Sequence, residues 1–336
     1  MTEIENRRPT LRDVARIANV SVATVSRTFA KPGEVTPQTR DRILAIARDV
    51  GYQFNQLAVD FRRGSTRTIV VLVSDISNAF FADFFKGIEE EARSKDYIVL
   101  MGDTGGGTWT ETTYFDMIRK GRADGLILNV GYFQSIEPAI GMRMISCNPF
   151  PNADLPTVTI DFAEGGRLAA ECLLARGHRR IAQLCGPLRS SGILQRHKGF
   201  NDALVAAGVL LDDNLVLSED LTMEFGMRAA EAIALMRPRP TAVFAHNDEV
   251  ALGVLHGLGR LGVRVPKDIS VVGFDDMQYS KAVTPALTTI RLPRRGWGQA
   301  ACRALLDMIE RNEVKPVMVT ITPELVERDS VADIRS

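Results

Sequence analysis

The chain has 336 residues, 45% of them hydrophobic and 24% charged, and its 41 basic residues balance its 41 acidic ones. At about 150 residues per domain, this length indicates two or three domains that can bury cores without disulfide or metal support. No segment approaches the ~18 apolar residues that a membrane span needs, and no secretory signal is visible at the N-terminus. We therefore expect a cytoplasmic protein.

The cysteines and histidines form no recognisable site. The sequence contains no C-x-x-C, no H-E-x-x-H, no P-loop and no G-x-G-x-x-G. This argues against a disulfide framework, a zinc site and a nucleotide-phosphate loop, and the scattered cysteines fit a reducing cytosol. We expect no catalytic residues, no metal and no cofactor.

Charge is distributed unevenly along the chain. Residues 1–65 carry 11 basic and 7 acidic residues, a net charge of +4, and the remainder carries 30 basic and 34 acidic residues, a net charge of −4. A basic head on an acidic body suggests a module that binds a polyanion. A charge of this size is also common on an ordinary solvated surface.

Three short helices are predicted within the first 51 residues. Thr10 and Asp13 form a capping-box start for the first helix. Ser21 can cap the second, and Thr36, which precedes a proline, begins a third that ends at Gly51. Two short helices joined by a tight turn and braced by a third form a helix-turn-helix, whose second helix lies in the major groove of DNA.

The second helix is the candidate DNA-reading element. Val25 and Phe29 occupy its inner face, which leaves Val22, Ala23, Ser26 and Arg27 pointing outward. An arginine can contact guanine O6 and N7 together, and small apolar side chains can contact a thymine methyl group. Short hydroxyl side chains near the helix starts are suited to phosphate contacts: Thr10, Ser21, Thr24, Ser26, Thr36 and Thr39. The alternative is a generic three-helix bundle with solvated polar residues.

Residues 55–63 form a connecting segment that is too short to hold an isolated helix in water. We expect it to become ordered only when another surface holds it. Phe61, which two arginines follow, could insert into a minor groove as an apolar wedge. Alternatively, Phe61 packs on the next domain.

From Thr68 onward, strands and helices alternate. Buried strands are predicted at 69–73, 97–101, 125–129, 158–160, 180–184, 242–245 and 269–274, with a further short strand near Ile145. Helices are predicted at 84–93, 112–120, 164–175, 195–207, 225–236 and 249–261. Two such sets predict an α/β body of two doubly wound lobes with a cleft between them, at the carboxyl ends of the strands.

Polar and aromatic residues follow these strands or open the next helix, where a ligand would lie. The candidates are Asp75, Phe80, Phe81, Asn148, Arg196, Asn247, Asp248 and Asp275. Carboxylates, amides and an arginine between aromatic walls suit a polyhydroxylated or heterocyclic small molecule. Structural roles are the alternative: Asp248 as a helix N-cap, Phe81 as core, or an ion pair between Arg196 and Asp275.

The segment Thr10-Leu-Arg-Asp-Val-Ala-Arg-Ile-Ala-Asn-Val-Ser-Val-Ala-Thr-Val-Ser-Arg resembles the signature of the LacI/GalR family of transcription regulators. Further stretches such as Asn78-Ala-Phe-Phe, Asn247-Asp-Glu-Val-Ala-Leu-Gly and Val272-Gly-Phe-Asp-Asp extend the resemblance over about residues 10–330. Within the family, the chain is most similar to the cytidine-responsive repressors of nucleoside genes, through Tyr97-Ile-Val-Leu-Met-Gly-Asp and Pro240-Thr-Ala-Val-Phe-Ala-His-Asn-Asp.

The resemblance implies a homodimer whose heads bind a pseudo-palindromic operator and whose body has a periplasmic-binding-protein-like fold. It places Val22, Ala23 and Arg27 at base-reading positions, and Asn55, Ala58 and Phe61 in the hinge that meets the operator centre. The implied effector-pocket residues are Phe80, Phe81, Arg196, Leu221, Asn247 and Asp275.

Four positions depart from the family pattern. Phe54 stands where a proline is common, Val59 where an arginine is common, and Phe61 where a leucine is usual. Leu221 replaces an aromatic residue that often stacks on the ligand. No heptad-bearing tail follows the core, so we expect a dimer rather than a coiled-coil tetramer.

Together these features predict a ligand-controlled, sequence-specific transcriptional repressor whose effector is a nucleoside or a sugar. The predicted domains are a helix-turn-helix head at 1–54, a hinge at 55–67 and a body at 68–336. Lobe 1 would comprise about 68–161 and 290–323, and lobe 2 about 162–289 and 324–336.

Two other functions would use the same body. A transport binding protein is opposed by the added head and the missing signal peptide. An α/β enzyme is opposed by the lack of a nucleophile–base–orienter set.

Overall fold

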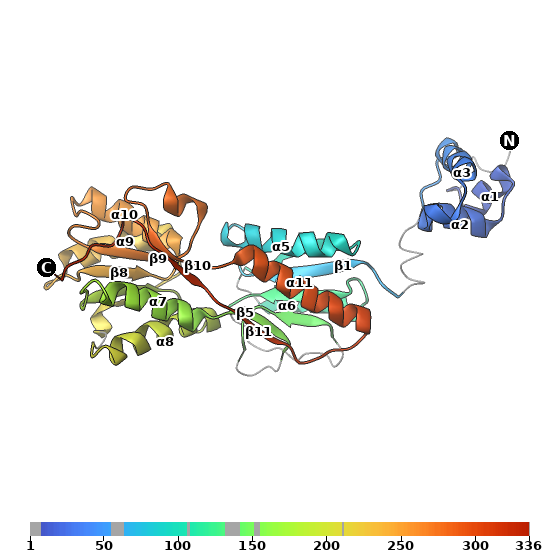
Figure 1. The fold of residues 1–336 in the computed structure, drawn as a ribbon. Coiled ribbons are helices and arrows are strands. Elements are labelled where there is room, and N and C mark those ends of the chain that lie inside the picture. Colours follow the sequence, from blue (N-terminus) through green and yellow to red (C-terminus); the bar gives the residue numbers. More distant parts are fainter. Residues whose placement is uncertain are drawn as a thin grey trace. The chain divides into compact units, whose positions relative to one another are not determined.

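A computed structural model of the chain describes residues 8–54, 64–105, 108–131, 142–150, 155–209 and 212–335. The chain divides into two compact units, Met1–Thr66 and Arg67–Ser336 (Figure 1). No helix in these described ranges is long and apolar enough to cross a membrane.

The first unit is a three-helix head, as predicted. It contains α1 (Leu11–Ala18), α2 (Val22–Ala30), a 3₁₀ turn η1 (Pro32–Glu34) and α3 (Pro37–Asp49). The backbone N–H and the hydroxyl of Thr10 donate to Asp13 Oδ2 at 2.9 and 2.6 Å, which is the predicted capping box. Ser21 Oγ accepts from the backbone N–H of Thr24 at 3.0 Å. These two start signals therefore act as real caps, whereas Thr36 occupies the N-cap position of α3 without a side-chain hydrogen bond to the backbone.

The core of the head takes one fully buried residue from each helix, Val14, Val25 and Ile43. Phe29 lies at its edge and stacks on Phe54 with ring centroids 4.8 Å apart. Leu44, next to the buried Ile43 on α3, is 37% exposed. Such a small core holds three helices but leaves most of the surface of α2 and α3 to solvent.

The first lobe of the second unit is built on a six-stranded sheet in the order β11-β5-β4-β3-β1-β2. Its strands are β1 (Thr68–Val73), β2 (Ile98–Asp103), β3 (Gly125–Asn129), β4 (Met144–Ser146), β5 (Thr157–Ile160) and β11 (Met318–Ile321). Its helices are α5 (Phe80–Ser94), α6 (Thr108–Arg119) and α11 (Arg294–Arg311). All neighbouring strands are parallel, and β1 is buried almost throughout, as its unbroken apolar run predicts.

The second lobe has a six-stranded sheet in the order β12-β10-β9-β8-β6-β7. Its strands are β6 (Ile181–Cys185), β7 (Val216–Ser218), β8 (Ala242–Ala245), β9 (Ser270–Asp275), β10 (Thr288–Arg291) and β12 (Glu324–Val326). Its helices are α7 (Phe162–Leu174), α8 (Ser191–Ala206), α9 (Met223–Leu235) and α10 (Asp248–Arg260), with 3₁₀ turns η2 (Asp213–Leu215) and η3 (Gln278–Lys281). Only β12 pairs in the antiparallel sense.

The chain passes between the two sheets three times: from β5 to α7, from β10 to α11, and from β11 to β12. The ends of several strands therefore meet where the lobes join, and this positions the candidate ligand site. The two-lobed, doubly wound architecture is the one the alternation of strands and helices predicted.

Two helix boundaries differ from the predicted ones in ways that affect the site, and one helix near the site has no predicted counterpart. Helix α5 begins at Phe80, so Phe80 and Phe81 lie in its first turn rather than in a loop. Helix α8 begins at Ser191, which places Arg196 in its second turn rather than at its start. Helix α11 was not predicted at all.

Candidate functional site

The exposed face of α2 carries the predicted base-reading residues. Val22 is 44% exposed, and Ala23 and Arg27 are also exposed, whereas Val25 on the other side of the helix is fully buried. Arg27 Nε lies 3.4 Å from the carbonyl oxygen of Ala23, a long contact that leaves the guanidinium head pointing to solvent. The structure thus brings these three side chains onto one open helix face.

Hydroxyl pairs mark the N-termini of α2 and α3. The hydroxyl oxygens of Ser21 and Thr24 lie 2.8 Å apart, and those of Thr36 and Thr39 lie 3.0 Å apart. Helix N-termini attract phosphate because their backbone N–H groups point outward and the helix dipole is positive there. Both ends are therefore suited to DNA backbone contacts.

The other predicted DNA contacts differ in status. The hydroxyl of Thr10 is used within the capping box, and Ser26 is half-buried. Asn55, Ala58 and Phe61 lie outside the described residues.

In the body, Arg196 is a buried cation held by aromatic rings. Its guanidinium carbon lies 3.5 Å from the ring centroid of Phe274 and 5.5 Å from that of Phe162. Nη1 donates to the backbone carbonyl of His246, and Nε has no partner among the described residues. Burial lowers the pKa of Arg196 to about 10, against the opposing effect of Asp275 and Asp248, so the side chain stays charged at neutral pH.

Asp275 ends β9 with its backbone at φ 115° and is only 8% exposed. Burial raises the pKa of its carboxyl to about 7, although Arg196 and Arg294 oppose the shift. Neither a hydrogen bond to its carboxylate nor an ion pair with Arg196 occurs within the described part of the chain, so the predicted structural pairing of the two is absent there. A buried carboxyl without donors is costly, which makes it a natural contact for a ligand.

The two candidate amides are used mainly inside the protein. Asn247 caps α10 by accepting from the N–H of Val250 at 2.8 Å, and its Nδ2 donates to the carbonyl of Leu221 at 3.2 Å. Asn148 Nδ2 donates to Asn129 Oδ1 at 3.2 Å and to the carbonyl of Val130 at 3.1 Å. These side chains fix the loops that surround the site.

Asp248 has structural partners on both carboxylate oxygens. It accepts from the N–H of Met277 at 2.8 Å, from Thr289 Oγ1 at 2.6 Å and from the hydroxyl of Ser280. It is fully buried and ties α10 to β10 and η3. The N-cap role that sequence reasoning allowed for Asp248 belongs instead to Asn247.

Aromatic residues of α5 form the wall on the side of the first lobe. Phe81 is 8% exposed and meets Phe80 edge to face, with ring centroids 5.2 Å apart. Phe80 also lies 6.4 Å from the ring of Trp297. Asp75, by contrast, is exposed and accepts from the N–H and hydroxyl of Ser77, which stabilises its own turn.

Sequence reasoning missed three aromatic side chains of this site: Phe162, Phe274 and Trp297. Phe162 comes two residues after β5 ends, so the rule that ligand residues follow strands would have found it. Phe274 lies within the Val272-Gly-Phe-Asp-Asp stretch itself. Trp297 lies on α11 and could not be placed without that helix.

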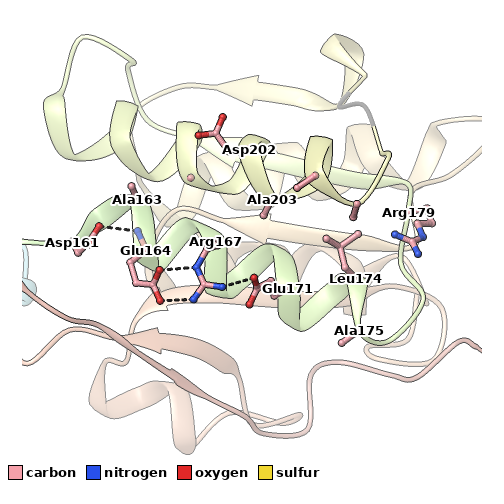
Figure 2. A pocket seen from close by; sticks show the side chains of 13 residues that line it. Asp161, Ala163, Glu164, Arg167, Glu171, Leu174, Ala175, Arg179, Asp202 and Ala203 are labelled. Atoms are coloured by element: carbon pink, nitrogen blue, oxygen red, sulfur yellow. Dashed lines mark hydrogen bonds and ion pairs between the residues drawn. The ribbon is translucent and has the colours of Figure 1, made fainter.

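An open hollow of about 850 Å³ lies on α7 and α8, and none of the predicted effector residues lines it (Figure 2). At its rim the Arg167 guanidinium bonds to Glu164, with Nε 2.6 Å from Oε2, and to Glu171 (Figure 2). Charges paired in this way are typical of a solvated helix surface.

Comparisons with known proteins establish the class of this protein. Residues 10–55 match the model of bacterial regulatory proteins of the lacI family, and residues 170–331 match a periplasmic binding protein-like domain. The chain is 36% identical to the HTH-type transcriptional repressor CytR of Escherichia coli (strain K12), over 96% of each chain. The chain belongs to the LacI family, and the predicted resemblance is confirmed.

Other relatives agree. The HTH-type transcriptional repressor PurR of Escherichia fergusonii is 33% identical over 96% of this chain and 97% of its own. The lac repressor dimer bound to operator and the anti-inducer ONPF shares the fold with a TM-score of 0.85 and 27% identity, over 97% of this chain and 100% of that one. The protein is therefore a DNA-binding transcriptional regulator of the kind controlled by small-molecule effectors, and not an enzyme.

Proposed function

We propose that the protein is a cytoplasmic, homodimeric repressor that binds a pseudo-palindromic operator and responds to a small molecule held around Arg196 and Asp275. The observation that carries this proposal is the buried Asp275 side chain, whose carboxyl accepts no hydrogen bond from the described part of the chain. The buried guanidinium of Arg196, whose Nε has no partner among the described residues, lies nearby. The head at 1–54, the hinge at 55–67 and the body at 68–336 are the proposed functional divisions.

The head would read DNA through α2. Arg27 would contact a guanine edge, and Val22 and Ala23 would pack against bases in the major groove. The N-termini of α2 and α3, with Ser21, Thr24, Thr36 and Thr39, would hold the phosphate backbone and so fix the register. Two heads related by the dimer axis would bind the two half-sites.

The chemistry of the body favours a ring with adjacent hydroxyl groups. A hydroxyl can donate to Asp275 and accept from Arg196, while the ring lies against Phe80 and Phe162. Sugars and nucleosides share this feature. In support, one solved relative at 28% identity is the transcriptional regulator CelR in complex with cellobiose. Another, from Enterococcus faecium and at 27% identity, is a LacI family transcriptional regulator with bound ribose.

A binding screen tests the effector proposal. Ribonucleosides, ribose and cellobiose would be screened by thermal shift, because a true ligand stabilises the fold by mass action. A ligand that shifts the melting temperature should also change operator affinity in an anisotropy titration. The Asp275→Ala and Arg196→Ala variants should lose both effects and keep operator binding.

The matched control is Arg264→Ala, which removes an exposed ion pair with Asp268 in the same lobe and should leave the response intact. Calorimetric binding retained in both Asp275→Ala and Arg196→Ala would place the ligand elsewhere. For the DNA arm, Arg27→Ala should cost about 1–3 kcal/mol of operator binding and relax discrimination at one base pair, with ligand affinity unchanged.

A further inference from the structure

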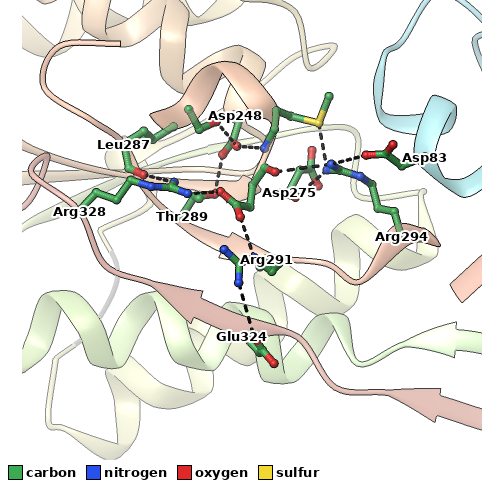
Figure 3. Close-up of polar contacts among 12 residues, drawn as sticks. Asp83, Asp248, Asp275, Leu287, Thr289, Arg291, Arg294, Glu324 and Arg328 are labelled. Atoms are coloured by element: carbon green, nitrogen blue, oxygen red, sulfur yellow. Dashed lines mark hydrogen bonds and ion pairs between the residues drawn. The ribbon is translucent and has the colours of Figure 1, made fainter. Parts of the chain in front are cut away.

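Arg294 is the first residue of α11 and reaches both lobes from a buried position. Its Nη1 donates to the backbone carbonyl of Asp275 at 2.6 Å, in the second lobe. Its Nη2 lies 3.3 Å from Asp83 Oδ2, on α5 of the first lobe (Figure 3). One side chain therefore connects the carbonyl of the proposed ligand residue to the opposite lobe.

The backbone that Arg294 holds is strained. Asp275 has φ 115° and Asp276 has φ 52°, both in the left-handed region that favours glycine. Such conformations persist only where surrounding contacts enforce them. Here Arg294 Nη2 also lies 3.5 Å from the carbonyl of Asp276, while Arg291 and Arg328 bind the Asp276 carboxylate at 2.7 and 2.5 Å. Three arginines thus fix the direction in which the Asp275 side chain points.

The other end of the connection is anchored in a tightly packed pair of helices. A Cβ atom at Gly298 of α11 would lie 2.1 Å from the carbonyl oxygen of Phe84, and one at Gly87 of α5 would lie 2.0 Å from that of Arg295. Because α5 and α11 are packed so closely, we expect them to move as one rigid unit that includes both Asp83 and Arg294. The Arg294 guanidinium also lies 5.7 Å from the ring of Phe80, one turn from Asp83.

We propose that Arg294 is a positioning residue that fixes the Asp275 bend and, through Asp83, couples ligand occupancy in the second lobe to α5 in the first. This inference rests on the proposed function, in which Asp275 contacts the effector. The peptide that carries Asp275 is bonded to Arg294, so any rotation of that peptide on ligand contact changes the contact with Asp83. Loss of the Asp83 charge should therefore reduce the coupling between effector and operator more than it reduces effector binding.

The test compares two substitutions on α5. Asp83→Asn removes the charge that Arg294 meets within the first lobe, while the same guanidinium donates to the Asp275 carbonyl of the second lobe. Glu90→Gln removes a matched charge between the same two helices, which pairs with Arg295, where Nε and Oε2 are 3.0 Å apart. Among the described residues, Arg295 has no hydrogen bond to the second lobe. The readout is the ratio of operator affinities with and without saturating effector, which measures the coupling between sites, together with effector affinity by calorimetry.

We expect Asp83→Asn to lower this ratio at least fivefold, with effector affinity within about threefold of the unmodified protein. Glu90→Gln should keep the ratio within about twofold. Arg294→Gln should lower both the ratio and the effector affinity, and Arg294→Lys should restore part of each because it keeps the charge but not the two-sided donor geometry.

The outcomes separate this inference from the proposed function. If Asp275→Ala abolishes effector binding but Asp83→Asn and Arg294→Gln keep the full ratio, the proposed site stands and the role of Arg294 is wrong. The same conclusion follows if Glu90→Gln lowers the ratio as much as Asp83→Asn, because the effect then belongs to helix packing. If Asp275→Ala binds effector normally, both the proposed ligand site and the proposed role of Arg294 are wrong.

Discussion

Two buried carboxyl groups, Asp248 and Asp275, differ in the partners that their oxygens have. Burial raises the pKa of both, to about 6 for Asp248 and about 7 for Asp275. Hydrogen bonds from Ser280, Thr289 and the Met277 N–H lower the pKa of Asp248 again. Asp275 has only the nearby arginine charges to oppose its burial. The free-energy cost of burying the Asp275 carboxylate therefore depends on whether a ligand donates hydrogen bonds to it. The Asp248 carboxylate already accepts hydrogen bonds within the protein.

This difference predicts a pH dependence of effector binding. A ligand that donates to the Asp275 carboxylate binds the deprotonated form, so its affinity falls as pH falls through about 7. Binding should be about tenfold weaker at pH 6 than at pH 8, by proton linkage. Calorimetry across this range on the unmodified protein and on Asp275→Asn tests it.

The Asp275→Asn variant should show no such slope. A slope of the same size in that variant would assign the titration to another group.

The raised pKa of Asp275 also sets the sign of the pH dependence of folding stability. Because the folded pKa lies above the ordinary value of 3.8, the stability linked to this group is fully present below about pH 3.8 and is lost as pH rises through about 7.

Among the helices and strands, the ones that the sequence predicts correctly are those that a few neighbouring residues determine. The three head helices follow from Thr10, Ser21 and the Thr36–Pro37 step. Thr10 and Ser21 satisfy backbone groups at their helix starts, and Pro37 has no N–H to satisfy at the first helical position. The strand at 69–73 follows from an unbroken apolar run. By contrast, β7 and β12 have three residues each, too few to show a period of two.

Helix α11 escaped prediction because of two glycines in its first turns, Gly296 and Gly298, which are poor helix formers. Gly298 is there for a tertiary reason, since the carbonyl of Phe84 occupies the space that a Cβ would need. The candidate site shows the same limit, because sequence patterns do not reveal contacts between distant residues. Arg196 and Asp275 could be predicted from their places near strand ends and helix starts. The contact of Arg294 with Asp83 could not, since it joins residues 211 positions apart.

The packing of α11 on α5 gives a stability prediction. Gly298→Ala would place a methyl group 2.1 Å from the Phe84 carbonyl, and the helices would have to separate. Overpacking of this kind costs about 1–3 kcal/mol of unfolding free energy. Gly296→Ala on the same helix meets nothing within 4 Å and should be neutral or stabilising by up to about 1 kcal/mol. Urea unfolding of both variants measures the difference, and equal effects would mean that α5 and α11 are not in close contact.

At the scale of the whole molecule, charge and contacts divide the chain at the same place. The net charge of +4 lies on residues 1–65, and along the chain the first compact unit ends at Thr66 and the second begins at Arg67. The head therefore holds the groups that we propose to meet phosphate, while the body holds the proposed ligand site, whose charged members, Arg196 and Asp275, are buried. Exposed charges are screened by salt and buried ones much less so.

The two activities should consequently respond to salt in different ways. Operator binding should weaken steeply, since each phosphate contact releases counterions; with 6–10 contacts the loss is about 10³–10⁵ between 50 and 200 mM salt. Effector affinity should change little over the same range, because its charged contacts are buried. A fragment from Arg67 onward should keep effector binding and lose operator binding, and its effector affinity should match that of the full chain at every salt concentration. Operator binding by that fragment, or a parallel loss of both affinities with salt, would show that the body itself carries the phosphate contacts.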